Sequence, residues 1–356
     1  MKEVVTSVPQ LCGLEPYDPK YLPAKALLSA NESPYDIPAA LREEIATAVS
    51  AVPFNRYPDP LANELRDMIA QENGLTRNQV LVGNGGDELL FNVALAYGCA
   101  GRKMINITPT FSVYELNARL NNTEVVEIPR NANLSLNEEA VLARVAQGDI
   151  SYVVITSPNN PTGSVASHDF IERLLNATNA LVLVDEAYGE FCPQATCLDL
   201  LGAHENLLIL HTFSKAFSLA GIRIGYFLGS EQVIREFIKF RQPYSVDAVS
   251  QAIAKVVYAH RGEFLQNART LAQAARDLAF KLGEVPGVQA VYPTDANFVL
   301  FKVPQAGKVW QRLYDQGVLV RDFSRCAGIE DCLRVTAGTP EENEQFLDAL
   351  AVALRE

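Results

Sequence analysis

One lysine of the sequence lies where a charged side chain is costly. Lys215 follows the apolar run LLIL (207–210) and the hydroxyls of Thr212 and Ser214, and seven small or apolar residues separate it from Arg223. Most lysines are solvated surface residues, but the sequence around this one is not charged. Burial lowers the pKa of an amine, and the free base can form a Schiff base with a carbonyl. Lys215 is therefore a candidate for the attachment of an aldehyde cofactor.

The obvious aldehyde cofactor, pyridoxal phosphate, needs four kinds of protein group. These are an anion site for its phosphate, a carboxylate for its pyridine nitrogen, a donor for its ring oxygen and a flat side chain against its ring. The sequence has a candidate for each of them directly after an apolar, strand-like run. The candidates are Gly85-Gly86-Asp87 at the start of a helix, Phe111, the pair Asn159-Asn160 between two prolines, and Asp185 with Tyr188 three residues on.

Each of these signals also has a simpler explanation. A short glycine stretch could bind a dinucleotide, Phe111 could be a core residue, and the two asparagines could only form a turn. Their shared location favours function, because ligands bind at the carboxyl ends of the strands in an open parallel sheet. A carboxylate at the end of a buried strand, such as Asp185, is costly unless it is paired, and a cationic pyridinium would pair it.

The elements that must position these residues alternate between strands and helices. The apolar runs show no alternation, which indicates burial on both faces, so we predict an α/β fold with a mostly parallel sheet between helices. The predicted strands cover 79–84, 103–109, 123–129, 151–158, 180–188, 206–212 and 224–228, and the predicted helices cover 87–98 (with Gly98 as C-cap), 112–122, 136–148 and 167–178.

The character of the sequence changes after residue 245. Because 356 residues exceed what one core usually holds, we expect two domains, with a long helix over 249–283 between them. The tail has strand candidates and a last helix that begins with Thr339 as N-cap, Pro340 in the first turn and Glu342 completing a capping box. We expect the helix over 38–52 to pack on this tail. The strand candidates of the tail cover 288–293, 297–303, 317–323 and 332–338.

Composition excludes several classes of partner. The net charge of −12 and the pI near 5.0 argue against nucleic acid or an anionic membrane. The first residues lack the apolar core of a signal peptide and no stretch is long enough to span a bilayer, so we expect a cytoplasmic protein. We expect free thiols, structural histidines and no metal site, because the spacing shows no C-x-x-C pair or histidine cluster. The cysteines are at positions 12, 99, 192, 197, 326 and 332, and the histidines are His168, His204, His211 and His260.

These motifs together resemble a known family. The stretch SKAFSLAGIRIG around Lys215, with NNPTG and VDEAY upstream in this order, resembles the fold-type I pyridoxal-phosphate aminotransferases of class I/II, over nearly the whole chain. Within that class, further stretches are similar to the histidinol-phosphate aminotransferases. That family usually has NENPYG where this chain has NESPYD, and often has Tyr where this chain has Phe111. The further stretches are LxPY (14–17), SANESPY (29–35), NRYPD (55–59), GNGGDE (83–88) and LRVTAGT (333–339).

The resemblance implies a domain organisation and a cofactor site. It implies a seven-stranded, mostly parallel sheet in a large domain, 53–282, which includes the long helix, a smaller α/β domain from 28–52 and 283–356, and an N-terminal arm, 1–27. The catalytic residues would be Lys215, which also moves the proton between the substrate Cα and the cofactor C4′, with Asp185 at the pyridine nitrogen and Tyr188 at the ring oxygen. The other cofactor contacts would be Asn160 at the ring oxygen, Phe111 against the ring, and Gly86, Asp87, Ser214 and Arg223 around the phosphate, joined by Tyr57 of a second subunit in a homodimer. Thr212 is a further cofactor-binding candidate.

The resemblance also implies substrates. It places Arg334 where aminotransferases bind a carboxylate, and Asn160 is a further substrate-binding candidate. Arg321, at the end of another apolar run, is a second candidate, and two arginines suit a dianionic phosphate or the two carboxylates of glutamate. Tyr17 is the candidate for contacting an imidazole. The implied reaction is transfer of the amino group of L-histidinol phosphate to 2-oxoglutarate, which gives imidazole-acetol phosphate and L-glutamate in histidine biosynthesis.

Three alternatives stay open at this point. A transaminase for aromatic amino acids and a threonine-phosphate decarboxylase of the same fold would have nearly the same motifs. A non-catalytic regulator that senses the cofactor would carry a DNA-binding module, for which the sequence has no room before residue 28. The acidic charge also argues against DNA binding.

Overall fold

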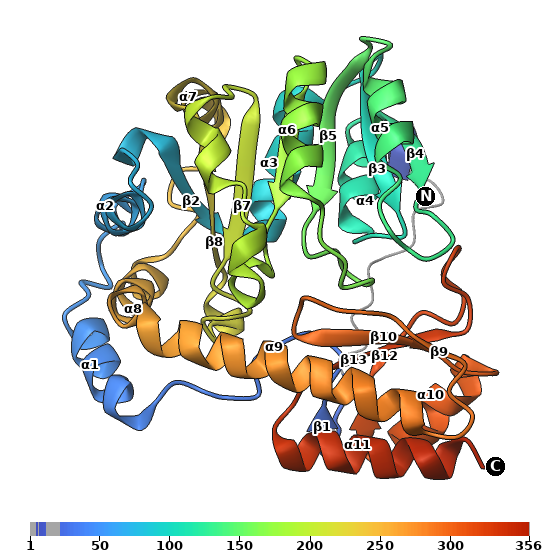
Figure 1. The fold of residues 1–356 in the computed structure, drawn as a ribbon. Coiled ribbons are helices and arrows are strands. Elements are labelled where there is room, and N and C mark those ends of the chain that lie inside the picture. Colours follow the sequence, from blue (N-terminus) through green and yellow to red (C-terminus); the bar gives the residue numbers. More distant parts are fainter. Residues whose placement is uncertain (1–4, 6, 12–21, 356) are drawn as a thin grey trace.

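The computed structural model describes residues 5, 7–11 and 22–355. A seven-stranded sheet forms its larger part, in the order β2-β8-β7-β6-β5-β3-β4 (Figure 1). Strand β8 is antiparallel to its two neighbours, while the pairs from β7 to β4 are parallel. The predicted α/β class and mostly parallel seven-stranded sheet are therefore confirmed. The strands are β2 (Val80–Asn84), β3 (Lys103–Thr108), β4 (Glu124–Pro129), β5 (Ile150–Thr156), β6 (Leu181–Asp185), β7 (Leu207–Thr212) and β8 (Ile224–Gly229).

Helices cover both faces of this sheet, as continuous apolar strands require. Alternate residues of the strands belong to two separate apolar clusters, one on each face. One face packs on α3 (Gly85–Tyr97), α4 (Val113–Leu120) and α7 (Glu231–Phe240). The other packs on α2 (Asn63–Glu72), α5 (Glu138–Val145), α6 (His168–Ala177) and α8 (Ala248–Ala259).

A second, smaller group of elements has its own core. A four-stranded antiparallel sheet, β12-β13-β10-β9, packs with three helices, and β1 pairs in parallel with β11 beside it. Thr339 and Glu342 form the predicted capping box of the last helix. The elements are β1 (Ala26–Leu27), β9 (Ala290–Val291), β10 (Phe298–Lys302), β11 (Val318–Leu319), β12 (Arg321–Asp322), β13 (Cys332–Thr336), α9 (Arg261–Glu284), α10 (Ala306–Asp315) and α11 (Pro340–Ala353).

Two predictions about helices are wrong. The expected single helix over 249–283 is two helices, because His260 leaves the helical conformation (φ −100°, ψ 18°) between α8 and α9. The helix α1 (Ala39–Ser50) packs on α8 rather than on the C-terminal tail, with Leu41 and Ile45 in the core of the large sheet. Periodicity shows which face of a helix is apolar, but it does not show which partner that face meets.

Short 3-10 helices complete the described chain. Among the described residues, no helix combines the length and the apolar character needed to cross a membrane. Nor does this part of the chain place three or more His, Cys, Asp or Glu side chains where they could hold a metal ion. The 3-10 helices are η1 (Pro9–Leu11), η2 (Arg77–Gln79), η3 (Gly189–Phe191), η4 (Pro193–Ala195), η5 (Leu198–Gly202) and η6 (Ala220–Ile222).

Candidate active site

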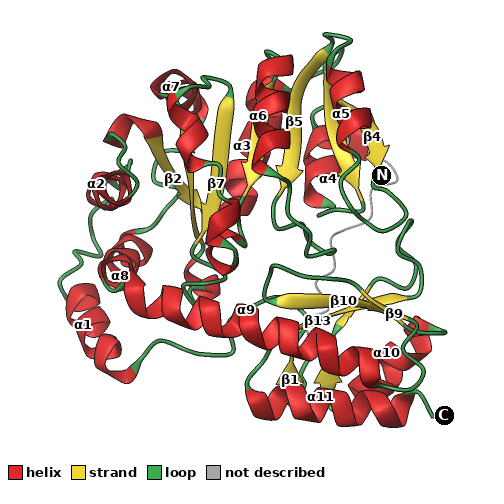
Figure 2. Ribbon diagram, viewed as in Figure 1, coloured by secondary structure: helices red, strands yellow, loops and turns green. Residues whose placement is uncertain are grey.

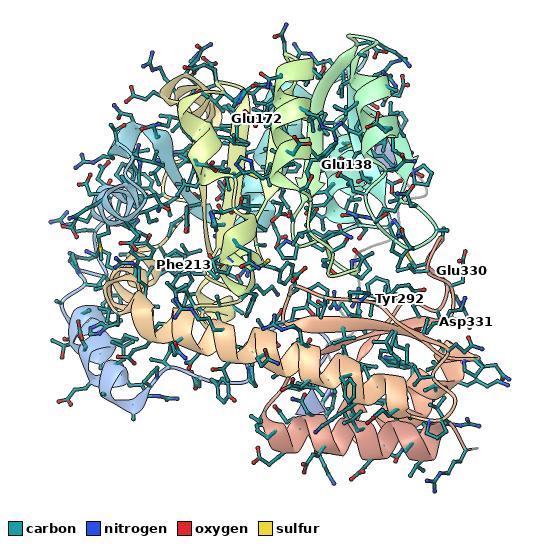
Figure 3. The ribbon with its side chains drawn as sticks, viewed as in Figure 1. Glu138, Glu172, Phe213, Tyr292, Glu330 and Asp331 are labelled. Carbon is teal, nitrogen blue, oxygen red and sulfur yellow. The ribbon has the colours of Figure 1, made fainter. Side chains whose placement is uncertain are left out.

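Most residues selected from the sequence lie where the carboxyl ends of the large sheet meet the small sheet. Loops gather at this junction (Figure 2). In Figure 3 Phe213, directly after β7, lies on the side of the large sheet, while Tyr292 and Asp331 lie on the side of the small sheet. Side-chain hydrogen bonds cross the junction, for example from Arg334 to Asn160. The parallel strands therefore bring residues from distant parts of the sequence to one place, as predicted.

Lys215 is half-buried at this junction. Its Nζ donates a hydrogen bond to the carbonyl oxygen of Ala30 at 2.7 Å and lies 6.0 Å from the centre of the Tyr188 ring. Burial lowers the pKa of Lys215 to about 8, and the positive charges of Arg334 and Arg223 act in the same direction. The amine therefore loses its proton more readily than an ordinary lysine, as a nucleophile and proton carrier must.

Asp185 lies at the end of β6 with only 4% of its surface exposed. The hydroxyl of Tyr114 donates to one carboxylate oxygen at 2.7 Å, and the backbone N–H of Ala187 donates to the other at 3.0 Å. Burial raises the pKa of Asp185, while these two hydrogen bonds act against the increase. A carboxylate has about four acceptor positions, so each oxygen keeps capacity for one further donor, such as a pyridinium N–H.

Tyr188 follows β6 of the large sheet and contacts residues on the side of the small sheet. Its hydroxyl accepts a hydrogen bond from Nδ2 of Asn31 at 2.8 Å, and its ring meets Phe298 of β10 edge-on, with centroids 5.1 Å apart. Asn31 is itself buried and accepts hydrogen bonds from Thr336 and Asn297. Tyr188 is therefore fixed by a segment that the sequence analysis linked to the family but to no particular role.

Several groups that suit an anion converge at the start of α3. Arg223 forms an ion pair with Asp87 (3.0 Å) and donates to Oγ of Ser214 at 3.3 Å. Thr212 contacts the same Ser214 hydroxyl at 3.0 Å. The carboxylate of Asp87 pairs with the guanidinium, so any contribution of Asp87 to binding an anion comes from its backbone N–H at the helix start.

The backbone of this cradle leaves no room for side chains. Gly85 has φ +72°, and a Cβ there would lie 2.6 Å from Nη2 of Arg223. A Cβ on Gly225 would lie 2.9 Å from the backbone of Gly85 and Gly86. Glycine is therefore required where the start of α3 meets Arg223. Free N–H groups of a helix start, two hydroxyls and a guanidinium form a donor set that fits a phosphate group.

The remaining ring and substrate candidates surround this region. Phe111 is half-buried and meets Tyr114 edge-on, with ring centroids 5.7 Å apart. Arg334 donates to Oδ1 of Asn160 and, at 2.6 Å, to the carbonyl oxygen of Ser29. Arg321 on β12 is the direct cross-strand partner of Arg334 on β13. The two arginines that the sequence analysis selected thus lie side by side in one sheet.

Two candidates are not placed in this arrangement. Tyr57 is 80% exposed and stacks on Tyr244 with centroids 4.4 Å apart, so within one subunit its ring is a surface group. Tyr17 lies outside the described residues.

Sequence reasoning did not select Tyr114 or Asn31, although each belongs to a quoted or neighbouring motif. Tyr114 follows Phe111 by three residues on the first turn of a helix, and this spacing is the signal that could have found it.

Lys215, Asp185 and the phosphate-type cradle together fit pyridoxal phosphate. Residues 23–350 match the sequence model of the class I and II aminotransferase family. The chain therefore belongs to this family of enzymes, which work with that cofactor. Within the class, it belongs with the histidinol-phosphate aminotransferases. The one from Chlorobium phaeovibrioides is 38% identical over 331 residues, which cover 91% of this chain and 89% of that protein.

Solved structures show the same fold. The histidinol-phosphate aminotransferase from Sinorhizobium meliloti, in complex with pyridoxal-5'-phosphate, has a TM-score of 0.90 at 22% identity, covering 99% of this chain and 98% of that one. The L-threonine-O-3-phosphate decarboxylase from Porphyromonas gingivalis has a TM-score of 0.82 at 24% identity, covering 93% and 100%. The predicted family and reaction class are confirmed. The fold itself is shared with a decarboxylase, so the fold alone does not identify the substrate.

Proposed function

We propose that the protein transfers the amino group of L-histidinol phosphate to 2-oxoglutarate, giving imidazole-acetol phosphate and L-glutamate, in histidine biosynthesis. The similarity to histidinol-phosphate aminotransferases over most of the chain supports this assignment. The structural observation that carries it is that Arg321 on β12 and Arg334 on β13 are directly opposite each other in the small sheet.

Two arginines in this position suit an anion. Directly opposite residues of antiparallel strands project from the same side of a sheet, and like charges placed there are destabilising. Arg334 is also buried, which adds a desolvation cost. A dianionic phosphate offsets both charges, and so do the two carboxylates of glutamate in the other half of the reaction. An amino acid with one carboxylate, such as phenylalanine, would use only part of this site.

We also propose roles for the other residues, and their positions support these roles. When bound, pyridoxal phosphate supplies an aldehyde that takes up the amino group and a ring that accepts electrons as the Cα proton leaves. Lys215 would form the covalent bond to the cofactor and would carry the proton. Asp185 would keep the ring nitrogen protonated, Tyr188 and Asn160 would donate to the ring oxygen, and Phe111 would pack on the ring. Arg223, Ser214, Thr212 and the N–H groups of Gly86 and Asp87 would hold the phosphate.

We further propose a cytoplasmic homodimer in which Tyr57 completes the phosphate site of the neighbouring subunit. The exposed rings of Tyr57, Tyr244 and Phe54 support this arrangement, because large apolar groups gathered on a surface favour contact with another chain. The division into an arm (1–27), a small domain (28–52 and 283–356) and a large domain (53–282) stays a prediction, although α1, within 28–52, packs on α8 beside the large sheet.

A side-by-side assay tests the choice of substrate. Purified enzyme loaded with pyridoxal phosphate is given histidinol phosphate, phenylalanine or threonine phosphate, and the formation of amino-transfer and decarboxylation products is measured. We expect kcat/KM to be highest for histidinol phosphate. A higher value with phenylalanine would identify an aromatic transaminase, and release of carbon dioxide from threonine phosphate would identify a decarboxylase.

A further inference from the structure

One hydrogen-bond donor to Asp185 comes from the apolar cluster on one face of the large sheet. Tyr114 comes from α4, is only 4% exposed and belongs to the apolar cluster between the sheet and helices α3, α4 and α7. Its hydroxyl nevertheless reaches the end of β6 and donates to Asp185 at 2.7 Å. The hydroxyl of Thr156, the cross-strand partner of Asp185 on β5, donates to the Tyr114 oxygen at 2.9 Å.

The direction of these hydrogen bonds is informative. Because Thr156 donates to the phenol oxygen, the single proton of Tyr114 is left for Asp185. The N–H of Ala187 donates to the other carboxylate oxygen. Both fixed neighbours are therefore donors, and a carboxyl group that meets only donors is favoured in its ionised form. They also restrict the orientation of the carboxylate, because each oxygen accepts from a different donor.

The surrounding charges show why this donor matters. Burial raises the pKa of Asp185 and the charge of Asp87 adds to the increase, whereas the hydrogen bonds from Tyr114 and Ala187 and the charge of His211 lower it. Among the contributions that lower the pKa of Asp185, the one from Tyr114 is the largest. Burial also raises the pKa of Tyr114 well above its ordinary value, so its hydroxyl keeps its proton and stays a donor.

We propose that Tyr114 is a positioning residue that keeps Asp185 ionised and aimed at the ring nitrogen of the cofactor. This inference rests on the role proposed above for Asp185. Without the phenol, the buried carboxylate becomes more basic, and the proton that it shares with the ring nitrogen moves toward Asp185. The ring then carries less positive charge and accepts electrons less well, although no residue that touches the substrate has changed.

The test replaces one hydroxyl and keeps the ring. Tyr114→Phe retains the edge-on contact with Phe111 and the packing of the apolar cluster. The matched control is Tyr152→Phe, because Tyr152 is 2% exposed and lies in the same cluster. Thr156→Val is a second variant that keeps Tyr114 but removes the hydroxyl that directs its proton.

The measurement is made on the holoenzyme loaded with pyridoxal phosphate that carries nitrogen-15 in its ring. The nitrogen chemical shift reports the protonation of the ring without any turnover, and equilibrium dialysis gives the dissociation constant of the cofactor. In Tyr114→Phe we expect the shift to move toward the unprotonated value and the dissociation constant to rise about tenfold or more, as expected for one lost hydrogen bond to a charged group. Thr156→Val should change both quantities less and in the same direction, and Tyr152→Phe should change neither.

The outcomes separate this inference from the proposed role of Asp185. If Asp185→Asn leaves the nitrogen shift as in the wild type, the role of Asp185 itself is wrong. If Asp185→Asn moves the shift but Tyr114→Phe does not, only the role of Tyr114 is overturned. An equal change in Tyr152→Phe would show that the effect comes from packing, and it would overturn the inference as well. Should Tyr114→Phe fail to fold, an unchanged shift in Thr156→Val has the same consequence.

Discussion

Replacing Arg321 by alanine tests the proposed substrate most directly. Arg321 is the cross-strand partner of Arg334 and, unlike Arg334, is only partly buried, so its loss leaves the core of the small sheet intact. A hydrogen bond between charged groups contributes about 1.5–3 kcal/mol. If Arg321 binds the phosphate, kcat/KM for histidinol phosphate should fall about 10- to 150-fold, since about 1.4 kcal/mol corresponds to a factor of ten. Phenylalanine has no second anion and should lose far less.

The assay measures each amino donor in a single-turnover half-reaction, so that binding of 2-oxoglutarate does not enter the comparison. Arg325→Ala is the control, because Arg325 is an exposed arginine on the loop directly after β12. Equal losses for histidinol phosphate and phenylalanine in Arg321→Ala would refute the phosphate-binding role. Arg321 would then support the sheet or the common chemistry of both reactions.

The remaining predictions concern the cofactor and the dimer. Lys215→Ala should fold, bind pyridoxal phosphate without a covalent bond and lose amino transfer by orders of magnitude. Borohydride should no longer fix the cofactor to the protein in this variant. Turnover near the wild-type rate would show that another group does the chemistry assigned to Lys215. Because burial lowers the pKa of Lys215 to about 8 from an ordinary 10.5, its amine is mostly uncharged above about pH 8. Cofactor uptake by the cofactor-free protein should therefore rise through this pH and level off well below pH 10, and a midpoint near 10.5 would contradict the burial of Lys215. Asp185→Asn should keep the cofactor but slow the half-reaction strongly in stopped-flow absorbance, because an amide does not stabilise a charged ring; an unimpaired rate means that another group protonates it. Mixing the inactive variants Tyr57→Phe and Lys215→Ala should restore activity, because a mixed dimer has one site with both defects and one site with neither. If activity does not increase although subunit exchange is confirmed, Tyr57 acts in the site of its own subunit.

The central part of the site could be predicted because strand ends are easy to find in this sequence. Continuous apolar runs show where each parallel strand ends, and parallel strands end at one edge of the sheet. This reasoning points to Lys215 and Asp185 as charged residues next to such runs. The structure brings them to one region together with Arg223, whose role the family resemblance implies. Lys215 and Asp185 were recognisable because their charges are costly in an apolar context.

Other residues could not be found in this way because their partners are distant in sequence. Tyr114 is one of several aromatic residues on amphipathic helices, and only the tertiary packing of α4 on β3 and β4 brings its hydroxyl to Asp185 at the end of β6. No proline marks the break between the helices α8 and α9 at His260, and the sequence around this residue keeps a helical pattern. Tertiary packing decides both features, and local pattern carries little of that information.

The segment 29–31 connects these observations. The carbonyl oxygens of its first two residues accept hydrogen bonds from Arg334 (2.6 Å) and Lys215 (2.7 Å), and the side chain of the third donates to Tyr188 (2.8 Å). Arg334, Lys215 and Tyr188 are therefore all hydrogen-bonded to the same short segment. They are also coupled by charge, because the positive charge of Arg334 is one cause of the low pKa of Lys215. If Arg334 binds an anion as proposed, that anion would offset its charge and raise the pKa of Lys215 toward its ordinary value, so a free Lys215 would be a stronger base when substrate is present.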